Sequence, residues 1–145
     1  MVHMLMYLLA LLVASGYAFS RGGTDERCGA IIIIAGSLLT LPAGGLNPRW
    51  EGTQYAILAI DIAALIAFFL LAALSDRFWP LWITAFHLVA VLTHVATITS
   101  SAILPKVYMN LQPIWAYPML LTLCLGSRTY WLGHGPLEDE SASSR

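Results

Sequence analysis

Residues 53–74 read TQYAILAIDIAALIAFFLLAAL, an apolar run that is interrupted by a single charge. A helix that crosses a bilayer needs about 20 mainly apolar residues, so this run is long enough to span. Four further runs meet the same requirement, and short connectors with charges, glycine or proline separate them. The five predicted spans are residues 2–20, 28–46, 53–74, 79–104 and 111–131.

The composition is typical of an integral membrane protein. Of the 145 residues, 59% are hydrophobic and 10% are charged, against roughly 25% charged in a soluble domain. The net charge is −1, so the chain lacks the excess of basic residues that favours binding to nucleic acid. The two cysteines, Cys28 and Cys124, have neither metal-finger nor redox spacing. We therefore expect a membrane protein with the lipid bilayer as its solvent, without nucleic acid, metal or catalytic motif.

The expected fold is an all-α, up-down bundle of five transmembrane helices, because short connectors force neighbouring helices to run antiparallel. The bundle would cover residues 1–132, followed by a disordered polar tail at 133–145. Basic residues concentrate on the cytoplasmic side of a membrane protein. One predicted face carries Arg21, Arg27, Arg77, Arg128 and Arg145, and the other carries Arg49 and Lys106. The N-terminus is thus predicted outside and the C-terminus in the cytoplasm.

Aromatic residues near the predicted span ends, Trp79 among them, are typical of interfacial anchors. Small residues mark a second kind of surface on the third span. Ala56, Ala59, Ala63 and Ala67 share one helical face. Helices in lipid associate through small residues that allow close backbone approach. This face is expected to meet another helix of the chain, a membrane-protein partner or a second copy in a homo-oligomer.

Asp61 is the only acidic residue inside any predicted span and lies nearly opposite the alanine face. A carboxylate at such a depth is costly, so it is a candidate functional site. On the fourth span His87, His94 and Ser101 recur every seven residues, with Thr97 beside them. Because the two helices are antiparallel, Asp61 and His94 are expected at nearly the same depth and within contact.

Two interpretations of this intramembrane polar site stay open. A buried carboxylate and stepped imidazoles can pass protons, because histidine titrates near neutrality. Alternatively, one interhelical hydrogen bond fixes the register of two helices. Haem is a further alternative through His94, although His87 and His94 share a helix and cannot clamp one iron from both sides.

The fifth predicted span contains Pro113 and Pro118, which are expected to break the helix near Trp115 and Tyr117. Carbonyls freed by proline can line a polar cavity. Any pocket is therefore expected among Asp61, His94, Trp115 and Tyr117, toward the outer leaflet.

Four phrases of the chain resemble small hypothetical bacterial inner-membrane proteins. They are YLLALLVASGY at 7–17, RGGTDER at 21–27, SDRFWPLW at 75–82 and WAYP at 115–118. The resemblance implies a bacterial inner membrane and carries no activity. The expected function is that of a non-enzymatic accessory or regulatory subunit. The alternative is a self-contained small-solute carrier or proton-linked transporter that uses Asp61 and His94.

Overall fold

The computed structural model describes residues 2–44, 55–99 and 112–134. Within these ranges the regular structure is entirely helical, which confirms the predicted all-α class. The elements are α1 (Val2–Arg21), α2 (Thr24–Gly44), α3 (Tyr55–Leu74), α4 (Trp79–Thr99), the 3₁₀ turn η1 (Gln112–Trp115) and α6 (Ala116–His134).

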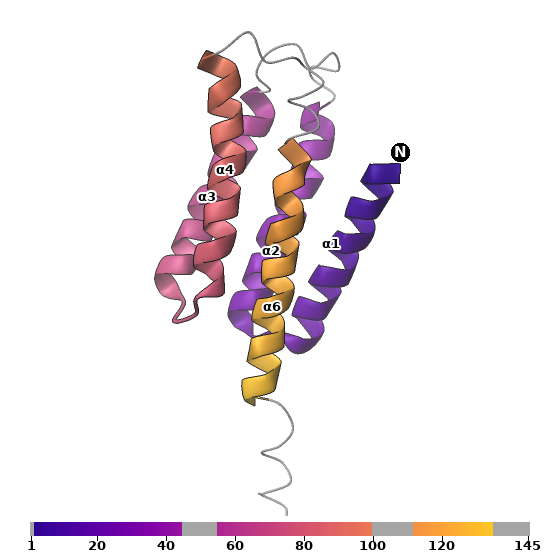
Figure 1. Cartoon of the computed structure of the whole chain (residues 1–145), viewed down its shortest axis with the longest axis vertical. Helices are drawn as coiled ribbons and strands as arrows, with labels where there is room; N and C mark the ends of the chain where they lie inside the picture. Colours follow the sequence, from indigo (N-terminus) through magenta and orange to yellow (C-terminus); the bar gives the residue numbers. More distant parts are fainter. Residues whose placement is uncertain (1, 45–54, 100–111, 135–145) are drawn as a thin grey trace, which may run out of the picture.

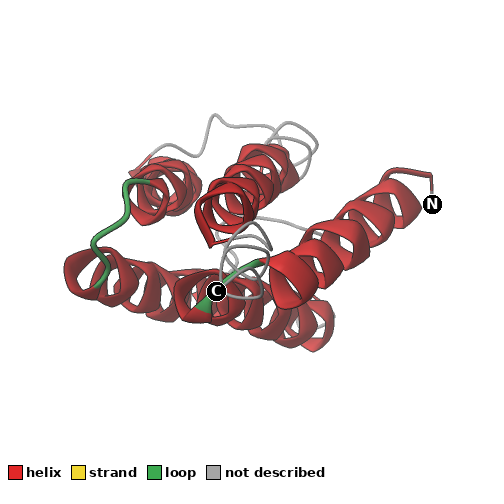
Figure 2. Cartoon of the chain, turned by 90° about the horizontal axis from the view of Figure 1, so that it is seen from below, coloured by secondary structure: helices red, strands yellow, loops and turns green. Residues whose placement is uncertain are grey.

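The helices alternate in direction and pack beside their neighbours in the chain (Figure 1). Contacts join α1 to α2, α2 to α3, α3 to α4 and α4 to α6, and α6 returns to α1. The helices therefore close into a ring, and α2 also touches α6 across it. Figure 2 shows the same bundle end on. The N-terminus and the end of α6 lie at opposite ends of the bundle.

Four helices, α1 to α4, are long and apolar enough to cross a membrane. The qualifying stretches are Met4–Arg21, Thr24–Ala43, Tyr55–Leu74 and Trp79–Ala96. Many large apolar side chains point outward from the bundle, among them Leu12, Phe69 and Leu74. Outward apolar surface of this kind suits a bundle that is surrounded by lipid.

The second helix begins earlier than predicted. Its expected start was Cys28, but α2 begins at Thr24, so most of the predicted connector at 21–27 is helical. Glu26 explains the difference, because its Oε2 accepts a hydrogen bond of 2.8 Å from the backbone N–H of Gly23. A glutamate in the first turn that reaches back to the residue before the helix satisfies a donor that would otherwise be unpaired.

The last helix also departs from the prediction. Pro113 lies in η1 and Pro118 in the first turn of α6, where a missing N–H costs little. The expected break near Trp115 is the change from the 3₁₀ turn to the α-helix at Ala116, whereas Pro118 does not interrupt α6. The helix continues to His134, which makes residues 133 and 134 helical and not part of a disordered tail. The predicted span ends at 45–46, 53–54 and 100–104, the beginning of the fifth span at 111 and the rest of the tail at 135–145 lie outside the described residues.

The core combines small and large apolar residues. Ala14 and Ala18 of α1 and Ala30 of α2 are buried. Larger side chains fill the space between them, including Phe68 of α3, Ile83 of α4 and Leu123 of α6. Small residues permit the close backbone approach that holds helices together in lipid.

Candidate functional site

Asp61 of α3 and His94 of α4 form the contact that their positions predicted. His94 Nε2 lies 2.9 Å from Asp61 Oδ2. The His94 side chain is fully buried and that of Asp61 is 15% exposed. The pair therefore sits inside the bundle, within two helices that can each span a membrane.

His87 contacts the backbone of the same aspartate. Its Nε2 lies 3.0 Å from the backbone carbonyl oxygen of Asp61. In a helix the side chain tilts toward the N-terminus, whereas the carbonyl points toward the C-terminus. Because α4 runs antiparallel to α3, a histidine two turns before His94 along α4 meets the carbonyl while His94 meets the carboxylate.

The protonation of His87 follows from this geometry. A carbonyl oxygen can only accept, so His87 donates the hydrogen bond through Nε2–H. The edge of its ring packs on Phe68, with ring centroids 5.4 Å apart. The two histidines thus hold α3 and α4 in one register through bonds to a single residue.

The geometry bears on the alternative that His94 holds a haem iron. In the described ranges, no three His, Cys, Asp or Glu side chains come together as metal ligands. His94 Nε2 is engaged by Asp61. An iron bound through that nitrogen would have to displace the carboxylate.

Of the other residues of the predicted site, the structure describes the positions of Thr97, Trp115 and Tyr117. Tyr117 belongs to α6 and meets Tyr7 of α1 edge to face, with ring centroids 6.2 Å apart. Asp61 lies on α3, which packs against α2 and α4. Trp115 is in η1, which contacts α4 and α6. Thr97 belongs to α4, and Ser101 falls outside the described residues.

A second polar cluster, which the sequence did not predict, is centred on Glu26 at the end of the bundle that carries Arg21 and Arg77. We call this the arginine end. The Glu26 side chain is fully buried. Its Oε1 accepts a 2.9 Å hydrogen bond from the indole Nε1–H of Trp79 and lies 3.8 Å from Arg77 Nε. Beside it, Ser75 Oγ donates to Asp25 Oδ2 at 2.5 Å. The α1–α2 and α3–α4 turns are therefore tied together.

Trp79 is a buried wedge and not the interfacial anchor that was expected. It is 7% exposed and lies between two glycines. A Cβ added to Gly29 of α2 would come within 2.7 Å of Trp79 Cη2, and one added to Gly126 of α6 within 2.7 Å of Trp79 Cγ. Three helices meet at this indole because both glycines lack a side chain.

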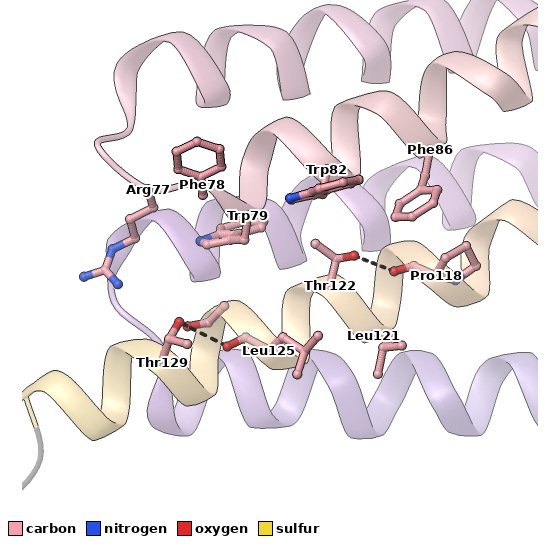
Figure 3. Close-up of a pocket in the computed structure, with 11 residues that line it drawn as sticks. Arg77, Phe78, Trp79, Trp82, Phe86, Pro118, Leu121, Thr122, Leu125 and Thr129 are labelled. Carbon is pink, nitrogen blue, oxygen red and sulfur yellow. Dashed lines mark hydrogen bonds between the residues drawn. The ribbon is translucent and has the colours of Figure 1, made fainter.

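Two cation–π contacts join the last helix to the same end. The guanidinium of Arg77 lies 4.8 Å from the centroid of the Tyr130 ring. That of Arg21 lies 4.4 Å from the Trp131 ring. Above these contacts an open groove runs between α4 and α6 (Figure 3).

Comparisons with known proteins add no relative to this description. No protein-family model, curated protein or solved structure matches the chain. The proposals below therefore start from the two polar clusters, the groove and the outer faces of the helices.

Proposed function

We propose that this chain is a non-catalytic accessory or regulatory subunit that packs against another membrane protein through the alanine face of α3. One observation carries the proposal. Ala59 and Ala63 are exposed in the folded bundle, and Ala56 and Ala67 are half-buried. The described helices thus leave Ala59 and Ala63 of this small-residue face uncovered, although α2 and α4 pack on α3.

The physical chemistry of lipid favours a helix on that face. Burying leucine against another helix gains little when lipid tails are equally apolar, so close packing of small residues drives association. The one charged side chain of α3 is turned inward to His94. A partner would therefore meet an apolar surface on which the Asp61 carboxylate does not need to be satisfied.

The proposed setting is a bacterial inner membrane, with five spans that include α6 and with the arginine end in the cytoplasm. Arg21, Arg27 and Arg77 lie at the turns of that end, and Arg128 lies near the end of α6. Basic residues are typical of the cytoplasmic side. A reporter fused after Arg145 is then expected to be active only in the cytoplasm, and an external signal would refute this orientation.

The decisive experiment is the native mass and composition of the complex after gentle extraction from its own membranes. We expect a larger, different membrane protein to accompany the chain. Replacing Ala59 and Ala63 together by leucine should lower partner recovery about tenfold, because bulky side chains prevent close backbone approach. Ala35→Leu, at an exposed site on α2, is the matched control. A chain extracted alone, or a double variant that keeps its partner, would refute the proposal.

The second candidate function is a self-contained small-solute carrier or proton-linked transporter that acts as a homo-oligomer without a different partner protein. The 2.9 Å contact between Asp61 and fully buried His94 favours it. An intramembrane carboxylate paired with an imidazole can exchange a proton. Asp61→Asn should then abolish proton-coupled uptake in vesicles while expression and assembly stay intact. Uptake that is unchanged by this substitution would exclude the carrier.

A further inference from the structure

The groove between α4 and α6 is a feature of the outer surface that neither the Asp61 cluster nor the Glu26 cluster explains. Its volume is about 590 Å³, within the range of roughly 300–1,000 Å³ that holds small ligands. Its walls are mostly apolar and come from Trp79, Trp82, Phe86, Pro118, Leu121 and Leu125. Arg77 stands at one end, and Pro118 and Phe86 lie at the other (Figure 3).

The polar side chains along α6 need nothing from an occupant. Thr122 Oγ1 donates to the carbonyl of Pro118 at 2.7 Å. Thr129 Oγ1 donates to the carbonyls of Leu125 and Gly126 at 3.1 and 2.7 Å. Because these hydroxyls are satisfied by their own helix, an apolar chain can lie along α6 without leaving either of them unpaired.

The length of the groove matches one leaflet of a bilayer. From Thr129 to Pro118 along α6, a rise of 1.5 Å per residue gives about 16 Å. The hydrocarbon core of a bilayer is about 30 Å thick. The groove begins at the helix ends near Arg77 and stops about halfway across, where a lipid acyl chain also ends.

Arg77 is placed to bind an anion at the open end of the groove. Its side chain is 29% exposed and is steadied by Glu26 through Nε and by the Tyr130 ring. A guanidinium has five N–H donors in a planar fork that suits phosphate. Phe78 beside it is exposed, as is typical of aromatic residues at the headgroup level.

We propose that this groove binds an anionic phospholipid, with one acyl chain between α4 and α6 and the phosphate on Arg77. The length of the groove, which equals that of one leaflet, favours a lipid acyl chain as the occupant. The positive charge of Arg77 at the headgroup end favours a lipid with net negative charge. The site uses α4 and α6, so it is independent of the alanine face of α3.

The test is competition between two lipids for the purified full-length chain. The delipidated protein in detergent is mixed with equal amounts of phosphatidylglycerol and phosphatidylcholine, and bound lipid is counted by native mass spectrometry. We expect about fivefold preference for phosphatidylglycerol, since a basic residue contributes roughly that much to binding of anionic lipid. Arg77→Gln should bring the ratio near one. Arg128→Gln removes an arginine outside the groove lining and should keep the preference.

A second pair of variants tests the acyl chain. Thr122→Phe places a ring in the groove and should reduce retention of both lipids severalfold. Leu70→Phe, at an exposed site on α3, should not. If Arg77→Gln fails to fold, the wild-type lipid preference and Thr122→Phe still decide the outcome. The assignment would be overturned if the wild-type chain retained the two lipids equally, or if Thr122→Phe had no effect. It would also be overturned if a cross-linker placed at position 121 captured another protein.

Discussion

Two carboxylates inside this bundle each contact a ring nitrogen of α4, but the two rings differ chemically. Asp61 and Glu26 each lie 2.9 Å from a ring nitrogen of α4, that of His94 and that of Trp79 respectively. Glu26 is fully buried and also accepts from a backbone N–H. Asp61 is 15% exposed, and its carboxylate meets an imidazole.

The difference lies in what each partner can do with a proton. Indole and backbone N–H groups only donate, so Glu26 has fixed partners. An imidazole can donate or accept according to its protonation. The Glu26 cluster therefore acts as a brace between two turns, whereas the Asp61 carboxylate meets a ring nitrogen of a type that can either donate or accept a hydrogen bond. Burial of a carboxylate alone does not separate these roles.

Removing the Glu26 side chain should produce the largest loss of stability. Glu26→Ala would leave the Trp79 indole and the Gly23 N–H without their acceptor and Arg77 without its counter-charge. A buried donor that is left without its acceptor costs about 1–3 kcal/mol, and two such donors lose their acceptor here. The free energy of unfolding in mixed detergent micelles measures this loss. Asp25→Ala at the half-buried neighbouring bond is the control and should cost less. Equal losses would mean that Glu26 is not the centre of the brace.

A smaller loss is expected when the wedge beside Glu26 is disturbed. The Cβ of Gly126→Ala would lie 2.7 Å from the Trp79 ring, and the flanking helices restrict its movement. Overpacking of this kind costs about 1–3 kcal/mol. Gly16→Ala is the matched helical control, because nothing lies within 4 Å of a Cβ there. It should be neutral or slightly stabilising. The same unfolding measurement compares the two, and a neutral Gly126→Ala would show that Trp79 is free to shift.

The Asp61–His94 contact could be predicted because it depends on helical repeat and chain direction alone. The apolar runs place each residue at a depth, and antiparallel neighbours then bring equal depths together. The bond from His87 to the Asp61 carbonyl was not foreseen, since a sequence does not show which backbone oxygen a side chain meets. It follows from the tilt of side chains toward the N-terminus of their helix.

The Glu26 cluster could not be predicted for a different reason. Glu26 stands in a stretch of charged residues, which is typical of a solvated connector. Its burial depends on Trp79 and Arg77, more than fifty residues away. The capping relation of Glu26 to Gly23 was the one local signal, and it would have given the correct start of α2. The groove likewise arises from packing between α4 and α6, which periodicity does not specify.

The smallest expected effect concerns the Asp61 pair itself. Asp61→Ala removes the carboxylate but leaves the backbone carbonyl in place for His87. A double-mutant cycle with His94→Ala isolates the bond between the two side chains. Hydrogen bonds between membrane helices average about 0.6 kcal/mol, so the coupling in mixed micelles should be far below the loss for Glu26→Ala. A coupling as large as that loss would make Asp61 a second brace, and the chemical distinction between the two carboxylates would no longer explain their roles.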